Sequence, residues 1–136
     1  MLKRLAIIFS LAVLAFAGPS YGKSLADQPV RVTVKDGVIS ADPDPVKMAK
    51  NSKKITWVLA TPGFTFPANG IVIKDADGEY GDCGIQVSKR KKADKDTEFV
   101  CRKLKHIGKK EYKYDVNLIN GSTGKPMVLD PTIQNE

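Results

Sequence analysis

The chain has 136 residues, and its 22 Lys and Arg against 15 Asp and Glu give a net charge of +7. This length suits one folded domain with a single core. With two cysteines and one histidine, the chain lacks the four Cys and His ligands of a structural zinc site unless carboxylates join them.

The first 22 residues have the layout of a secretory signal peptide. Lys3 and Arg4 precede an apolar stretch over residues 5–17, and small residues then offer cleavage after Ala17 or after Gly22. The apolar stretch is shorter than the roughly 20 residues of a spanning helix, so no permanent membrane span is expected. Residues 23–136 are expected to form the mature protein, periplasmic or secreted, with 20 cations against 15 acids and a net charge of +5.

Alternating apolar residues predict strands through most of the mature chain. Residues 30–40 alternate valine with polar residues and contain an Asp-Gly pair, which is a strong hairpin signal. The ADPDP stretch that follows contains Pro43 and Pro45, which have no backbone N–H to donate to a β-ladder. It therefore predicts a sheet edge or a crossing between sheets. Residues 53–60, with Trp57 near their middle, are the best candidate for a central strand.

The second half of the chain continues the pattern. Further strands are predicted at residues 71–73, 83–88, 97–101, 111–119 and 126–129. Phe64 and Phe66 are assigned to core packing, with a binding groove as the alternative. No long helix is expected in the mature chain. Short strands, turns and frequent Gly and Pro predict an all-β fold, a single antiparallel β-sandwich.

The two cysteines, Cys83 and Cys101, are predicted to form a disulfide between neighbouring strands. An even cysteine count in an exported chain favours this pairing. The alternative is a nonstandard metal site that uses Cys101 and His106, with Cys83 or Met127 as a further ligand.

Residues 75–86 begin like a calcium loop, with Asp75, Asp77 and Glu79 at alternate positions. Tyr80 stands where such a loop needs glycine, and Gln86 where it needs a bidentate glutamate. We therefore expect a turn between two strands rather than a calcium site.

Three stretches resemble the cupredoxin-like sandwich: residues 30–48, residues 55–66 with their ITW strand start, and residues 111–119 with their YKY motif. The resemblance implies a cupredoxin-like sandwich, for which the immunoglobulin-like sandwich is the related form. In that family, copper is held by two histidines, a cysteine and usually a methionine. Here no histidine follows the ITW strand, and Val116 stands where the resemblance would place the cysteine. The resemblance therefore extends to the fold and not to a copper centre.

Two basic runs, SKRKK and CRKLKHIGKK, carry much of the positive charge. They are read either as solvated loops and strand ends or as an anion-binding face for envelope polysaccharide, lipid headgroups or an acidic protein. The candidate anion-binding residues are Lys89, Arg90, Lys91, Lys92, Arg102, Lys103 and Lys105. Nucleic acid is not expected as a partner, because the runs lack the interleaved aromatic residues on which bases stack.

These observations predict an exported, non-catalytic binding or accessory module of the envelope without a cofactor. An enzyme is not expected, because catalysis needs titratable groups that converge on a substrate, and this chain has one histidine, no expected free thiol and carboxylates mostly in turns. Neutralising residues 89–92 together is predicted to abolish binding to an anionic partner without unfolding the domain. A metal-handling protein is the alternative, and a structural subunit with an exposed sheet edge near Pro43 and Pro45 is a third possibility.

Overall fold

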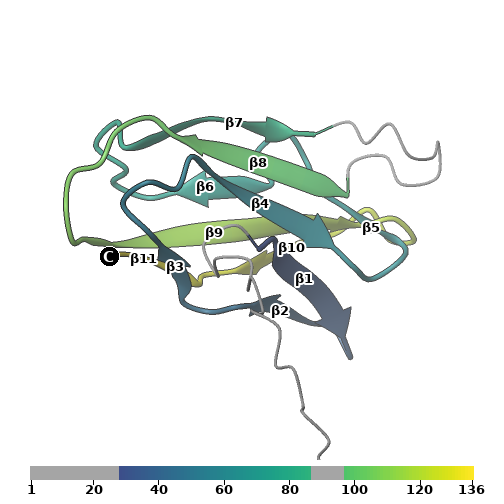
Figure 1. The fold of residues 1–136 in the computed structure, drawn as a ribbon. Helices are drawn as coiled ribbons and strands as arrows, with labels where there is room; N and C mark the ends of the chain where they lie inside the picture. Colours follow the sequence, from purple (N-terminus) through teal and green to yellow (C-terminus); the bar gives the residue numbers. More distant parts are fainter. Residues whose placement is uncertain (1–27, 87–96) are drawn as a thin grey trace, which may run out of the picture.

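The computed structural model describes residues 28–86 and 97–136, and within them the fold is all-β (Figure 1). The predicted signal peptide and the candidate residues Lys89, Arg90, Lys91 and Lys92 lie outside the described residues. The strands are β1 (Val30–Lys35), β2 (Val38–Asp42), β3 (Val46–Met48), β4 (Lys54–Leu59), β5 (Phe64–Thr65), β6 (Ile71–Ile73), β7 (Tyr80–Ile85), β8 (Glu98–Lys103), β9 (Glu111–Asn120), β10 (Pro126–Leu129) and β11 (Thr132–Asn135).

The strands form two sheets. The first sheet has the order β2-β1-β4-β8-β7. In the second sheet the long strand β9 pairs with β10 and β11, and also with β5 and β6, while β3 pairs with β11. As predicted, β1 and β2 form a hairpin through Asp36 and Gly37, both at positive φ. The stretch with Pro43 and Pro45 carries the chain from β2 in the first sheet to β3 in the second, which confirms the predicted crossing.

The prediction of a purely antiparallel fold is wrong, because both sheets are mixed. β1 runs parallel to β4, and β11 runs parallel to β3. The chain leaves the first sheet after β2 and returns as β4 beside β1, in the same direction. Alternation of side chains has the same period of two in parallel and antiparallel strands, so the sequence pattern does not carry the strand direction. The final strand β11, at residues 132–135, was not predicted at all.

The core is formed by buried residues of both sheets. Trp57 of β4 packs against Tyr114 of β9 with ring centroids 5.5 Å apart, so the central strands of the two sheets are in direct contact. Phe66 is buried against Phe99 of β8, which agrees with its assignment to the core. Along β9 the alternate residues from Tyr112 to Leu118 are buried, as their spacing predicts.

Candidate functional site

The predicted disulfide is confirmed: the sulfur atoms of Cys83 and Cys101 are 2.08 Å apart. The bond joins β7 to its antiparallel neighbour β8, where the pairing register shifts between Gly81 and Gly84. Cys101 is buried and Cys83 is exposed, so the bond reaches from the core to the surface. Neither sulfur is therefore available as a free thiolate ligand.

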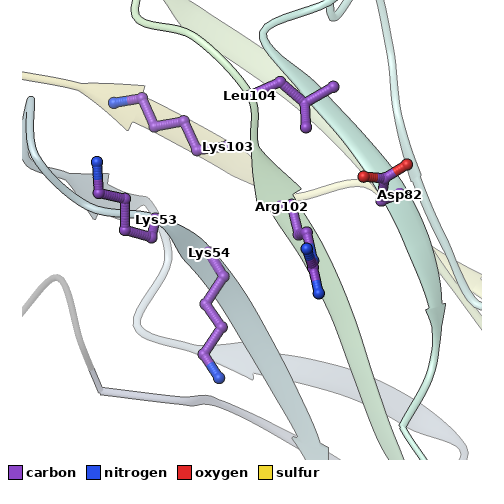
Figure 2. Close-up of a pocket in the computed structure, with 6 residues that line it drawn as sticks. All are labelled: Lys53, Lys54, Asp82, Arg102, Lys103 and Leu104. Carbon is purple, nitrogen blue, oxygen red and sulfur yellow. The ribbon is translucent and has the colours of Figure 1, made fainter.

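A depression of about 400 Å³ (Figure 2) includes Asp82 and Arg102, the sequence neighbours of the two cysteines. It is lined by Lys53, Lys54, Asp82, Arg102, Lys103 and Leu104. Arg102, predicted as an anion-binding residue, lies directly across from Lys54 on the paired strands β8 and β4. The side chains of these two residues extend in the same direction (Figure 2).

The positive charges of the depression are only partly balanced by acidic side chains. Two like charges directly across a strand pair destabilise a sheet. Lys53, Lys54 and Arg102 are exposed, and their side chains make no hydrogen bond or ion pair within residues 28–86 and 97–136. Among the residues that line the depression, Asp82 is the one acid. This arrangement can attract a negatively charged group to the surface.

Lys103, also predicted as an anion-binding residue, points the other way. It alternates with Phe99 and Cys101 along β8 and therefore faces the interior. Its side chain is 2% exposed; the ammonium donates a hydrogen bond of 3.1 Å to the carbonyl oxygen of Ala49 and lies 3.9 Å from Oε1 of Glu79. Desolvation lowers the pKa of Lys103, and the charge of Glu79 opposes that shift.

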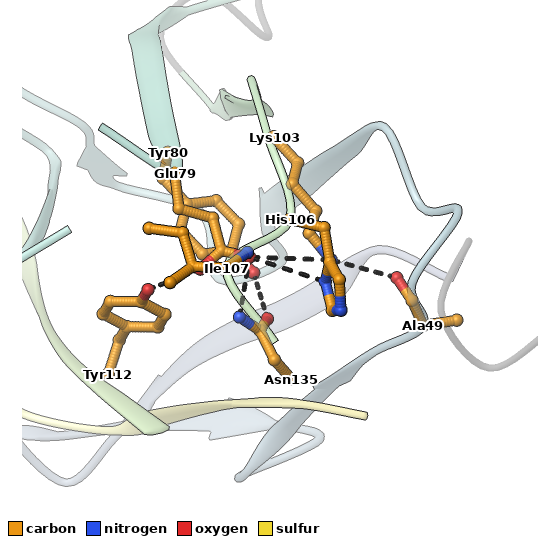
Figure 3. A network of polar contacts seen from close by, with 8 residues as sticks. All are labelled: Ala49, Glu79, Tyr80, Lys103, His106, Ile107, Tyr112 and Asn135. Atoms are coloured by element: carbon orange, nitrogen blue, oxygen red, sulfur yellow. Dashed lines mark hydrogen bonds and ion pairs between the residues drawn. The ribbon is translucent and has the colours of Figure 1, made fainter. Parts of the chain in front are cut away.

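Glu79, fully buried, is the centre of a polar network at the end of the core (Figure 3). Its carboxylate accepts hydrogen bonds from the hydroxyl of Tyr112, from Nδ2 of Asn135 at 2.8 Å and from the backbone N–H of Ile107 at 3.4 Å. The hydroxyl of Tyr80 donates to Oδ1 of Asn135 at 2.6 Å. Desolvation is the largest cause that raises the pKa of Tyr80 and of Tyr112, and Glu79 raises both further.

His106 belongs to the same network. Its Nδ1 lies 3.8 Å from Oε1 of Glu79 and finds no hydrogen-bond partner among the described residues. In the part of the chain that the structure describes, no three His, Cys, Asp or Glu side chains are grouped as metal ligands. Met127, the other candidate ligand, lies on β10 of the second sheet. The pair Cys101 and His106 therefore has less support as a metal site than the sequence alone suggested.

The carboxylate of Glu79, at the centre of the network, is not accessible for acid or base chemistry. A general acid or base has to come within hydrogen-bond distance of the substrate. Because Glu79 is fully buried, its carboxylate is not in contact with solvent. What the network does is hold the segment after β8: the N–H of Leu104 donates to the carbonyl oxygen of Glu79 at 2.7 Å, and the N–H of Ile107 donates to its side chain.

Sequence reasoning missed Lys53 and Lys54, and it placed Glu79 in a turn without predicting its burial. The two lysines are distant in sequence from the basic runs and join Arg102 only through the pairing of β4 with β8. A signal for Lys103 was available, since its alternation with Phe99 and Cys101 already places it on the buried face. The last predicted cation, Lys105, is exposed, and its ammonium lies near Gly78.

Comparison with protein-family models and with curated protein sequences finds no match for this chain. Within the described residues, no helix has the length and apolar character needed to cross a bilayer.

Proposed function

We propose that this protein is an exported, non-catalytic binding module that holds an anionic partner against Lys53, Lys54 and Arg102. The observation that carries the proposal is the pair of opposed cations, Lys54 and Arg102, at the depression. A bound anion would relieve their mutual repulsion, since a negative group between them interacts favourably with both.

The remaining features support a binding role over catalysis. The surface site is open, and four of its six lining side chains are cations, with Asp82 as the one acid. In the Glu79 network, the side chains of Glu79 and Lys103 are enclosed, and His106 is partly exposed. An exported cupredoxin-like or immunoglobulin-like sandwich that presents a charged face is our proposal for the whole molecule, and the two sheets with a shared core support it.

The experiment that tests this function compares two double variants of equal charge. Lys54→Gln with Arg102→Gln removes the opposed pair, whereas Lys35→Gln with Lys47→Gln removes two exposed cations outside the depression. Binding to dextran sulfate, a soluble sulfated polysaccharide, is measured by calorimetry at low and high salt.

We expect the first variant to lose at least about tenfold in affinity, or about 1.4 kcal/mol. We expect the control to change much less, and the wild-type affinity to fall as salt screens the charges. Equal losses in the two variants would show that only net charge matters and would contradict a site at Lys54 and Arg102.

A further inference from the structure

Exposed aliphatic side chains lie next to the basic depression. Leu104, which lines the depression, is 55% exposed, and Ile107 is 45% exposed. Both belong to the segment between β8 and β9, which runs around the same end of the molecule as the C-terminus (Figure 1). Aliphatic side chains left in water in this way carry a free-energy cost that a binding partner can remove.

The segment is fixed in place, so the exposure of these side chains is built into the fold. The backbone N–H groups of Leu104 and Ile107 donate to the carbonyl and the carboxylate of Glu79, the buried centre of the network (Figure 3). The side chain of Leu104 lies over Gly81 so closely that a Cβ at Gly81 would come within 2.8 Å of it. The Glu79 network therefore supports a surface segment that presents apolar groups outward.

Cations lie beside Leu104 and on the segment that carries Ile107. Leu104 shares the depression with Lys53, Lys54 and Arg102. Lys105 and Lys109 are exposed on the segment itself. The nearby acid Asp77 is paired with Lys110, which leaves less negative charge to repel an anionic surface.

A second pair of exposed valines lies in a groove that no cation lines. Val38 of β2 and Val128 of β10 are 62% and 63% exposed, and glycine and apolar side chains line their groove, although the exposed Lys35 pairs with Val38 across β1 and β2. Charge complementarity thus distinguishes the Leu104 end of the molecule from the Val38 groove.

We propose that the anionic partner is a lipid bilayer surface, on which Leu104 and Ile107 enter the headgroup region while Lys53, Lys54 and Arg102 face lipid phosphates. The proposal rests on the proposed function and names its partner. A membrane surface presents negative headgroups directly above hydrocarbon, and binding to it increases with both buried apolar area and basic charge. A soluble polysaccharide would use the cations and leave the aliphatic side chains in water.

The test measures cosedimentation of the purified protein with vesicles of equal parts phosphatidylglycerol and phosphatidylcholine, and with vesicles of phosphatidylcholine alone. Leu104→Gln with Ile107→Gln removes the aliphatic pair and keeps the charge. Val38→Gln with Val128→Gln is the matched control, because it changes two exposed aliphatic residues in the other groove. Dextran sulfate binding is measured in parallel for every variant, and circular dichroism checks that each one is folded.

We expect the wild type and the Val38 and Val128 variant to bind the anionic vesicles, and the Leu104 and Ile107 variant to bind them at least about tenfold more weakly. Its dextran sulfate binding should change much less, because the cations that hold the anion remain. If the Leu104 and Ile107 variant binds the vesicles as well as the wild type, apolar insertion is refuted. If the wild type binds dextran sulfate but not vesicles, the lipid proposal fails and the anion-binding function stands. Binding to neither probe would overturn both.

Discussion

Glu79 and Lys103 are two charged residues that the fold places inside the protein. Each forms contacts that an exposed residue would not need: Lys103 bonds to the carbonyl of Ala49, and Glu79 accepts from Tyr112, Asn135 and Ile107. Buried charges are tolerated when hydrogen bonds and a counter-charge replace the lost water. The pair therefore connects Lys103, at the C-terminal end of β8, to Glu79, in the loop that precedes β7.

Replacing Glu79 with Gln is expected to destabilise the protein by about 3 kcal/mol, because it leaves the Lys103 ammonium buried without its counter-charge. The measurement is the free energy of unfolding in urea. Glu111→Gln is the control, since Glu111 is exposed and its loss is expected to change stability by less than about 0.5 kcal/mol.

A double variant that also carries Lys103→Met should regain part of the loss, because the unpaired charge is then removed. If Glu79→Gln alone is as stable as the wild type, the carboxylate charge does not hold the network together.

At the scale of elements, the disulfide fixes the pairing of β7 with β8. β7 is an edge strand of the first sheet, and its register with β8 shifts at the position of Cys83. An edge strand with an interrupted ladder has fewer backbone hydrogen bonds than a central strand. The covalent link to the buried Cys101 keeps β7 in register, and with it Asp82 at the edge of the depression.

Breaking the disulfide, with a separation of 18 residues, is expected to lower stability by about 3 kcal/mol through the greater entropy of the unfolded chain. The urea midpoint of the wild type is measured with and without dithiothreitol. The double variant Cys83→Ser with Cys101→Ala should match the reduced wild type and should not respond to reductant. A midpoint that stays the same after reduction would mean that the β7–β8 pairing does not depend on the bond.

At the scale of the whole molecule, three tyrosines lie between the two sheets. The pKa values of Tyr80, Tyr112 and Tyr114 are raised above the ordinary 10.0, chiefly because burial disfavours the charged phenolate. Tyr80 and Tyr112 stack edge to face, and Tyr114 contacts Trp57. Ionising any of them would place a negative charge inside the core.

Stability is therefore expected to fall as the pH rises above about 10, because the unfolded chain then releases tyrosine protons that the folded protein retains. Below that pH the stabilisation is fully present. Lys103 has the opposite effect on stability, because its pKa is lowered in the folded protein. Just below pH 10.5 the unfolded chain therefore binds more protons than the folded protein, and stability rises with pH in that range. The effect of three tyrosines on stability exceeds that of one lysine, so we expect a net loss of stability above about pH 10.

The measurement is an alkaline titration that records tyrosinate absorbance and circular dichroism together. Both signals should change at the same pH, since the three tyrosines ionise when the protein unfolds. The titration uses a Tyr21→Phe variant, which removes the one tyrosine outside the described residues. In this variant, tyrosinate absorbance near pH 10 with an intact dichroism spectrum would contradict the prediction.

The sequence by itself determined the local features of this protein. The alternation of β9 and β4, the hairpin at Asp36 and Gly37 and the crossing at the two prolines depend on side-chain period and on turn chemistry, which neighbouring residues specify. The disulfide was also predictable, because Cys83 and Cys101 flank one connection between adjacent strands.

Tertiary structure alone decided which strands meet. The parallel pairings of β1 with β4 and of β3 with β11, the burial of Glu79 and the meeting of Lys54 with Arg102 all join residues far apart in sequence. A period of two in the side-chain pattern assigns a residue to one face of a sheet, but it specifies neither which strand lies beside it nor the direction of that strand. For that physical reason the depression, which residues of β4, β7 and β8 line together, could not be predicted from the basic runs alone.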